Sequence, residues 1–257
     1  MGRIVTVTRL RLAELVRQPL TLLLMLVLPP VVVETYGVAV KSFPQLPNLA
    51  AAPATVGRMT GTLFAVAFLA GLVGLFQVIS ARRGDERATI VGFPRWGLLA
   101  TRLLTVFVVA VAGATVALAT LGYNVAIEAP VLAFAFLVVA ALIYGLLGVV
   151  VGTLVPKELE GSIVLVFLAD IDNALSSGLV PIGASTDLPL VGTVGVVDFV
   201  PLYHPSELFA TAVLDGEVAS VHLLPVVGWV LGLLVIAFVA YGRSAGNGWF
   251  TPNGGTA

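Results

Sequence analysis

Acidic and amide side chains interrupt an otherwise apolar stretch near residues 162–181. Asp170, Asn173 and Ser177 recur at helical spacing, so a helix would carry them as one polar stripe. An acidic residue at membrane depth is costly and usually faces a cavity or a partner. The stripe therefore predicts the lining of a transport pathway or an ion-coupling carboxylate. The alternative is that the helix ends early and these side chains lie in a water-filled outer vestibule.

A second group of candidate functional side chains lies in the segment 81–102, where charged residues are mixed with Ile, Val, Phe, Trp and Leu. Gly92 and Pro94 predict two short helices there. Charges beside buriable aromatic residues have the composition of a docking surface. The residues that we expect to form it are Arg83, Asp85, Glu86, Arg87, Phe93, Arg95 and Trp96. The alternative is an interfacial turn with its Trp side chain anchored at the lipid headgroups.

Other chemistries find little support in the sequence. The chain has no Cys, and its two histidines, His204 and His222, are not at metal-ligand spacing. Ser176 and Ser177 lack the Gly-x-Ser-Gly spacing of an intramembrane serine protease. Neither of the two lysines follows a Gly-x-x-x-x-Gly stretch, so there is no nucleotide-binding loop. ATP hydrolysis, if the function needs it, must come from another polypeptide, and a net charge of −1 gives no indication of nucleic-acid binding.

The composition indicates where these groups are positioned. The chain of 257 residues is 59% hydrophobic and 11% charged, whereas a typical soluble domain is about 25% charged. We therefore expect an all-α membrane protein, one domain over residues 1–243, with six transmembrane helices of about 20 apolar residues. The expected spans are Leu20–Val40, Met59–Ser80, Leu103–Tyr123, Val131–Leu154, Ser162–Pro181 and Leu223–Tyr241. Glycines on the second and fourth spans, such as Gly71 and Gly148, predict close helix packing.

The positive charges fall almost wholly in alternate gaps between these spans. Only Lys41 and Arg58 lie on the other side. Positively charged loops stay cytoplasmic, so the pattern predicts that both termini and the segment 81–102 are cytoplasmic.

Three further segments complete the expected organisation. Residues 2–18 read as an imperfect amphipathic helix lying in the cytoplasmic interface, with a plain basic stop signal as the alternative. Residues 182–222 are apolar and carry no Lys or Arg, so we expect them to fold back onto the outer mouth of the protein as a re-entrant region. A short helix is expected within it, capped by Ser206 and running through Leu214, with Gly216 after it. The Gly-rich tail 244–257 is expected to be disordered.

The order of these parts resembles the membrane subunits of type-2 ABC exporters over nearly the whole chain. The resemblance rests on a basic interfacial helix, a Pro-containing first span, a charged loop between spans two and three, and an apolar outer excursion before the last span. Gly84-Asp-Glu-Arg87, Gly92-Phe-Pro-Arg95 and Leu98-Leu99-x-x-Arg102 look like the coupling-helix region of that family. The segment His204-Pro-Ser-Glu-Leu208 also resembles the family before its last span.

The resemblance implies a permease subunit in a prokaryotic plasma membrane, without ATPase activity of its own. Its partners would be a cytoplasmic nucleotide-binding ATPase, which carries the ATP and Mg²⁺, and a second permease subunit, identical or a sister chain. The docking residues named above would contact the ATPase, and Asp170, Asn173 and Ser177 would line the pathway. Two other hypotheses are an autonomous proton-coupled secondary transporter that uses Asp170 or Asp172, and a membrane enzyme or scaffold.

Overall fold

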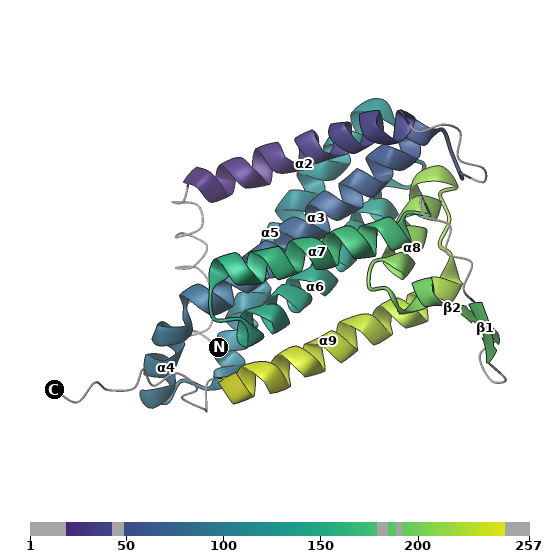
Figure 1. Ribbon diagram of the computed structural model, residues 1–257. Coiled ribbons are helices and arrows are strands. Elements are labelled where there is room, and N and C mark those ends of the chain that lie inside the picture. The colour runs from purple at the N-terminus through teal and green to yellow at the C-terminus, as the bar shows by residue number, and fades with distance from the viewer. Residues whose placement is uncertain (1–18, 43–48, 179–184, 189–191, 245–257) are drawn as a thin grey trace.

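The computed structural model describes residues 19–42, 49–178, 185–188 and 192–244, and this part of the chain is mostly helical (Figure 1). Its long helices are α2 (Pro19–Lys41), α3 (Pro53–Ser80), α5 (Arg95–Asn124), α6 (Pro130–Leu154), α7 (Glu158–Ser176) and α9 (Leu223–Ser244). Shorter elements are α4 (Arg82–Ile90), α8 (Tyr203–Leu214) and the 3-10 helices η1 (Val196–Phe199) and η2 (Ser220–His222). The expected interfacial helix at 2–18 and all but the first residue of the expected tail lie outside the described residues.

One β-hairpin departs from the all-α expectation. Strand β1 (Ser185–Leu188) pairs antiparallel with β2 (Gly192–Gly195), with Ser185 opposite Gly195 and Leu188 opposite Gly192. The segment is too short and too rich in Gly and β-branched residues for a stable helix. The outer excursion therefore contains a hairpin as well as a helix.

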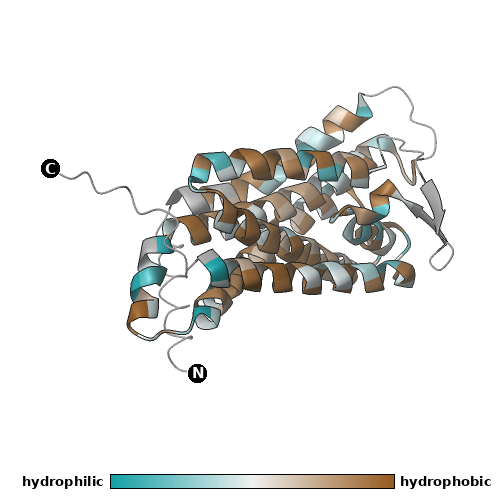
Figure 2. Cartoon of the chain, turned by 60° about the horizontal axis from the view of Figure 1, so that its bottom comes forward, coloured by the Kyte–Doolittle hydropathy of each residue, from teal (hydrophilic) through white to brown (hydrophobic). Residues whose placement is uncertain are grey.

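Four helical segments in the described part of the chain are long and apolar enough to cross a membrane, namely α3, α5, α6 and the segment Ser220–Arg243 that contains α9. For these four, the expectation of helices long and apolar enough to span a membrane is confirmed. Helix α7 is more polar because it carries Glu158, Glu160, Asp170 and Asp172. Figure 2 shows hydrophobic residues along the long helices and hydrophilic residues gathered toward their ends.

Contacts distant in sequence define two ends of the helical bundle. At one end, Arg82 at the start of α4 donates to the carbonyl oxygen of Gly152 near the end of α6. At the opposite end, Glu34 of α2 pairs with Arg58 of α3 (3.0 Å) and accepts from Asn124, the last residue of α5 (2.8 Å). Successive long helices therefore run in alternating directions, as the ribbon in Figure 1 shows.

The core is formed where α3 and α6 pack together, the most extensive helix contact of the bundle. A side chain at Gly148 would overlap the carbonyl oxygen of Gly71, and one at Gly74 would overlap that of Gly145. The predicted role of these glycines in close helix packing is confirmed. Tight backbone contact of this kind gains dispersion energy where lipid and protein are equally apolar.

Two expected boundaries in the charged segment need correction. Helix α4 ends at Ile90, and Gly92 adopts a left-handed conformation (φ 85°) that turns the chain. The second short helix does not exist as a separate element, because Arg95 already begins α5, eight residues before the expected start of the third span at Leu103. After Pro94 no further Pro follows within α5, and the isolated Gly97 in its first turn is tolerated, so the helix continues into the bundle.

The outer helix also begins earlier than expected. Helix α8 begins at Tyr203, and Leu202 rather than Ser206 occupies its N-cap position. The Ser206 hydroxyl instead donates to the carbonyl oxygens of Tyr203 (2.7 Å) and of Ser176 at the end of α7 (3.2 Å). Gly216, with φ 72°, follows the helix end as the sequence predicted. Helix α8 packs against α6, so this part of the excursion folds back onto the bundle.

Candidate functional site: a charged helix tied to the bundle

Helix α4 presents an exposed surface that combines charge with apolar side chains. Glu86 and Arg87 are exposed on it. At its end, Ile90 is 86% exposed and Val91 is 85% exposed. Trp96, in the first turn of α5, is 57% exposed. Large apolar side chains so exposed beside charges are typical of a protein interface.

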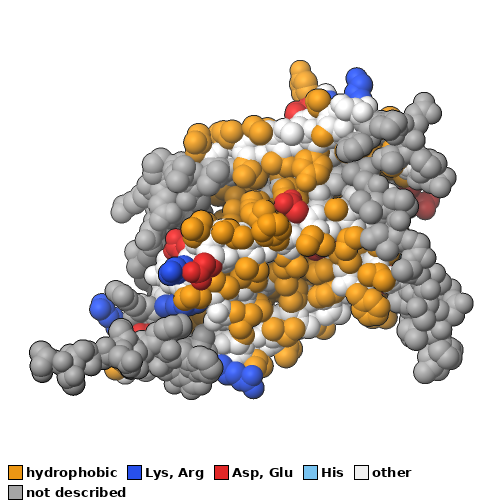
Figure 3. Space-filling view, in the orientation of Figure 1, with side chains coloured by type: hydrophobic (Ala, Val, Ile, Leu, Met, Phe, Trp, Pro, Cys, Tyr) orange, Lys and Arg blue, Asp and Glu red, His pale blue; other side chains and the backbone are white. Residues whose placement is uncertain are grey.

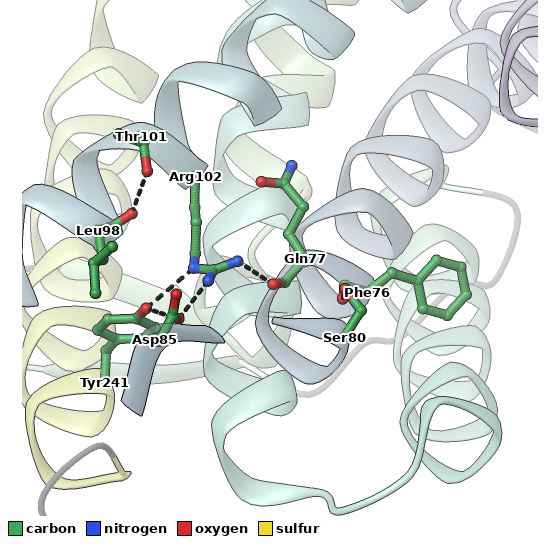
Figure 4. A network of polar contacts seen from close by, with 8 residues as sticks. All are labelled: Phe76, Gln77, Ser80, Asp85, Leu98, Thr101, Arg102 and Tyr241. Carbon is green, nitrogen blue, oxygen red and sulfur yellow. Dashed lines mark hydrogen bonds and ion pairs between the residues drawn. The ribbon is translucent and has the colours of Figure 1, made fainter. Parts of the chain in front are cut away.

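The opposite side of α4 is anchored by a buried polar network, shown in Figure 4. Asp85 of α4 pairs with the guanidinium of Arg102 on α5, and both residues are buried. The Tyr241 hydroxyl near the end of α9 donates to the same Asp85 oxygen and accepts from Nε of Arg102 (3.1 Å). A further N–H of Arg102 donates to the carbonyl oxygen of Gln77 on α3. We call Asp85, Arg102, Tyr241 and the Gln77 carbonyl the latch.

The latch satisfies its charges locally. Removing two ions from water costs several kcal/mol per ion unless good geometry and additional hydrogen bonds compensate. Arg102 donates three hydrogen bonds, and its guanidinium carbon lies 5.7 Å from the centroid of the Tyr241 ring, within range of a cation–π contact. The arrangement is therefore a stable connection that joins α4 to α3, α5 and α9.

Two arginines beside the latch reinforce it. Arg82 donates to the carbonyl oxygens of Gly152 and Val155 at the end of α6, both at 2.5 Å. Arg95 donates to the carbonyl oxygen of Gly242 on α9 (2.8 Å). The α4 region therefore contacts the ends of α6 and α9 as well as α3 and α5.

The residues expected to form a docking surface have different positions. Glu86, Arg87, Arg95 and Trp96 are exposed, and Phe93 is half-buried. Asp85 is 5% exposed and forms part of the latch, so it is not a surface contact in this structure. Arg83 lies in α4, but its side chain is outside the described residues.

The three residues expected to line a pathway do not form one stripe in contact with a single space. Asp170 is exposed, whereas Asn173 is buried and donates to the hydroxyl of Tyr36 on α2 (3.2 Å). Ser177, just past the end of α7, is half-buried and donates to the carbonyl oxygen of Ala174 (3.1 Å). The apolar side chains around Asp170 belong to a largely hydrophobic face, which Figure 3 shows with few charged side chains.

Asp172 has a different environment from Asp170. Its carboxylate is buried and accepts hydrogen bonds from the Tyr144 hydroxyl on α6 (2.5 Å), the Ser176 hydroxyl (3.0 Å) and the Leu202 backbone N–H (3.1 Å). A carboxylate with three fixed donors connects α6, α7 and the start of α8. This geometry is that of a structural acceptor that joins these elements away from the α4 end of the bundle.

An open groove of about 770 Å³ lies between α2 and α5 near the end of the bundle opposite α4. Glu34 lies at its edge, paired with Arg58. The hydroxyls of Thr115 and Thr120, which also line it, donate to backbone oxygens of their own helix. The groove therefore has a mainly apolar wall and no uncompensated charge at Glu34.

Arg102, Tyr241 and Arg82 are the functional candidates that the sequence reasoning missed. Arg102 carried only a weak signal in the sequence, because it stands at the last position of the charged segment 81–102, one residue before the expected span. The partner Asp85 is 17 residues away across a turn, and Tyr241 is more than a hundred residues away. Neither pairing follows from periodicity within one helix.

No protein-family model matches the chain, and no curated protein matches it. The function must therefore be argued from the geometry of α4 and the latch.

Proposed function

We propose that the chain is the permease subunit of an ATP-binding-cassette exporter and that α4 is its coupling helix. The observation that carries this proposal is the two-sided character of α4. One side presents Glu86, Arg87, Ile90 and Val91 to a partner, and the other is anchored in the bundle through the latch. A loop that only connected two helices would need neither feature.

Mechanically, the latch turns movement of α4 into movement of the bundle. A ligand shifts a two-state equilibrium only through its differential affinity for the two states. A cytoplasmic ATPase that binds α4 more tightly in one position would supply that difference. Because Arg102 and Tyr241 are bonded to Asp85, displacement of α4 would pull α5 and α9 with it. The ATP and Mg²⁺ belong to the ATPase subunit.

The orientation follows from the distribution of basic residues between the two ends of the bundle. The α4 end carries Arg82, Arg87, Arg95, Lys157 and Arg243, and the opposite end carries Lys41 and Arg58. With the α4 end in the cytoplasm, α2 and α7 complete six spans and both termini are cytoplasmic. The protein would then lie in a prokaryotic plasma membrane.

The cargo pathway in this proposal lies between two permease subunits. Asp170 faces outward from the exposed apolar side of α7. A carboxylate in that position would be unfavourable in lipid. A second subunit, identical or a sister chain, would cover this face and place Asp170 and Ser177 beside a shared cleft.

A proton-coupled secondary transporter is the alternative, but the environment of Asp172 favours the exporter. A proton carrier needs a carboxyl group that alternates between two environments. Asp172 is instead held by donors from α6, α7 and the segment before α8.

The decisive experiment is gentle solubilisation of the tagged chain from native membranes, followed by measurement of the co-purifying ATPase activity. We expect a nucleotide-binding subunit to co-purify. Substituting Ile90→Ser together with Glu86→Lys should abolish its retention, because both side chains belong to the exposed surface of α4. Tyr123→Ser, 91% exposed at the opposite end, is the matched control and should retain the ATPase.

Transport that continues without ATP and collapses with the proton gradient would reject the exporter in favour of the secondary transporter.

A further inference from the structure

The two histidines of the chain, 18 residues apart in sequence, are in direct contact. His204 lies in the first turn of α8 and is buried, and His222 is the last residue of η2, directly before α9. Their Nδ1 atoms are 2.9 Å apart. The ring of Tyr203 lies edge-on to both imidazoles, with centroids 5.1 and 5.8 Å away. The pair therefore joins the outer helix to the beginning of the last long helix.

The hydrogen-bond pattern fixes how protons are distributed over this pair. Nε2 of His204 lies 3.0 Å from the backbone oxygen of Asp198, which can only accept. His204 must therefore carry a hydrogen on Nε2, and in its neutral form its Nδ1 is an acceptor. It follows that His222 donates through Nδ1–H, so one proton lies between the two rings.

Protonation affects this contact in two distinct steps. The first added proton binds Nε2 of His222, and the bridging hydrogen bond remains. The second added proton must occupy Nδ1 of His204, so that two N–H groups on two cations face each other. Like charges at this separation repel by several kcal/mol even at the effective dielectric of a protein surface. The contact therefore holds with one positive charge and breaks with two.

The carboxylates near the pair compensate only in part for positive charge, because burial has the larger effect on the pKa of His204 and lowers it. The groups whose charge acts on His204 are His222, Asp198 of η1 and Glu207 of α8. The Asp198 carboxylate already accepts the backbone N–H of Gly195 (2.7 Å). Burial raises the pKa of Glu207, which weakens it as a counter-ion at acidic pH. Helix α6 has no charged residue, the one charge of α9 is Arg243 at its far end, and Asp172 of α7 is bonded to Tyr144, Ser176 and Leu202.

We propose that His204 and His222 form an acid-sensitive clasp that holds α8 against the start of α9 and releases it when both rings are protonated. Release would detach the first turn of α8 from the start of α9. Because Ser206 in this turn donates to the Ser176 carbonyl oxygen of α7, the attachment of α8 to α7 would be affected as well. The clasp would thus loosen the outer end of the bundle under acidic conditions. It does not depend on the proposed ATPase coupling, because its residues lie at the end opposite to α4.

The direction of the pH dependence follows from linkage. Burial lowers the pKa of His204 below its ordinary value of 6.5. A His with a depressed folded-state pKa stabilises the folded arrangement above its unfolded pKa, and this stabilisation is lost as the pH falls through the folded value. The clasp is therefore closed at neutral pH and opens below about pH 6.5.

Thiol accessibility can test the clasp, since the chain contains no Cys. The reporter is Ser206→Cys, a near-isosteric change at a half-buried position two residues after His204, and the reference is Ser220→Cys at an exposed position in η2. The ratio of their reaction rates with a thiol reagent removes the pH dependence that the two thiols share. As the pH falls through the transition, we expect this ratio to rise by about tenfold per pH unit, because opening takes up one proton. His222→Gln should give a ratio independent of pH, and Tyr203→Phe should keep the wild-type profile.

Several outcomes would overturn the proposal. A ratio equal at pH 8 and pH 5 in the wild-type background would do so, as would a pH step that persists in His222→Gln. Loosening of the clasp at pH 8 on addition of a chelator would mean that a metal ion, rather than a shared proton, joins the two histidines. Nitrogen NMR of the full chain labelled at His needs no substitution, and it should show that both rings titrate in two separate steps; simultaneous, independent titration would reject the shared proton.

Discussion

At the scale of single residues, the latch shows why Arg102 is tolerated inside an apolar helix. Its side chain is fully buried, yet each branch of the guanidinium has a hydrogen-bond acceptor. Such a pair adds little net stability compared with well-packed apolar side chains, but removing one partner leaves an uncompensated buried charge. The latch is therefore sensitive to single substitutions in a way that exposed charges are not.

Arg102→Met should lower the free energy of unfolding by about 3–5 kcal/mol, because Asp85 would remain buried without its counter-ion. The measurement is denaturation in detergent micelles. Arg87→Met, which changes an exposed side chain of α4, should stay within about 0.5 kcal/mol of the wild type. The double substitution with Asp85→Asn should lose less than the sum of the two single changes. Additive losses would mean that Arg102 and Asp85 do not interact.

At the scale of elements, the sequence predicted those features that depend on local pattern. Apolar runs placed α3 and α6 to within six residues at their starts and at the same last residue, and Gly92 and Gly216 marked turns correctly. Charge alternation predicted that α4 and the end of α9 lie at the same end of the bundle, as the contact between Asp85 and Tyr241 shows.

The remaining features depend on contacts that no local pattern encodes. Asp172 and Asn173 lie next to each other, but one binds Tyr144 and the other binds Tyr36. The sequence predicts Asp85 on the docking surface because charges beside apolar residues have the composition of one. Its burial depends on Arg102, which only the folded bundle brings near. The hairpin β1–β2 was missed since its strands are only four residues long.

The contact between α3 and α6 predicts a difference between glycines that look alike in sequence. Gly148→Ala should destabilise the protein by about 1–3 kcal/mol, because the added methyl group would overlap the carbonyl oxygen of Gly71. Gly232→Ala on α9 has open space around it and should stabilise the helix by up to about 1 kcal/mol. Thermal denaturation of both variants in the same detergent measures the difference. Equal effects would show that α3 and α6 do not approach so closely.

At the scale of the whole molecule, the two ends of the bundle would have different tasks in the proposed exporter. The α4 end carries the latch and the proposed docking surface, and the opposite end carries α8, the hairpin and the two histidines of the proposed clasp. In the proposed exporter the long helices between them would transmit movement, because they are packed in contact and because polar bonds tie both ends of α5 and the middle and last turn of α6 to neighbouring elements. An exporter driven from one side of the membrane requires such a polarity.

The orientation of this polarity is the premise on which the exporter depends, and single cysteines can test it directly because the chain has none. Ile90→Cys would report the α4 end, and Tyr123→Cys would report the opposite end, since both positions are highly exposed. A membrane-impermeant thiol reagent added to intact cells should label Tyr123→Cys and leave Ile90→Cys unlabelled until the cells are permeabilised. Labelling of Ile90→Cys from outside would place α4 beyond the reach of a cytoplasmic ATPase. In that case the exposed surface of α4 would need an extracellular partner, and the arginines of the α4 end would oppose the usual charge distribution of membrane proteins.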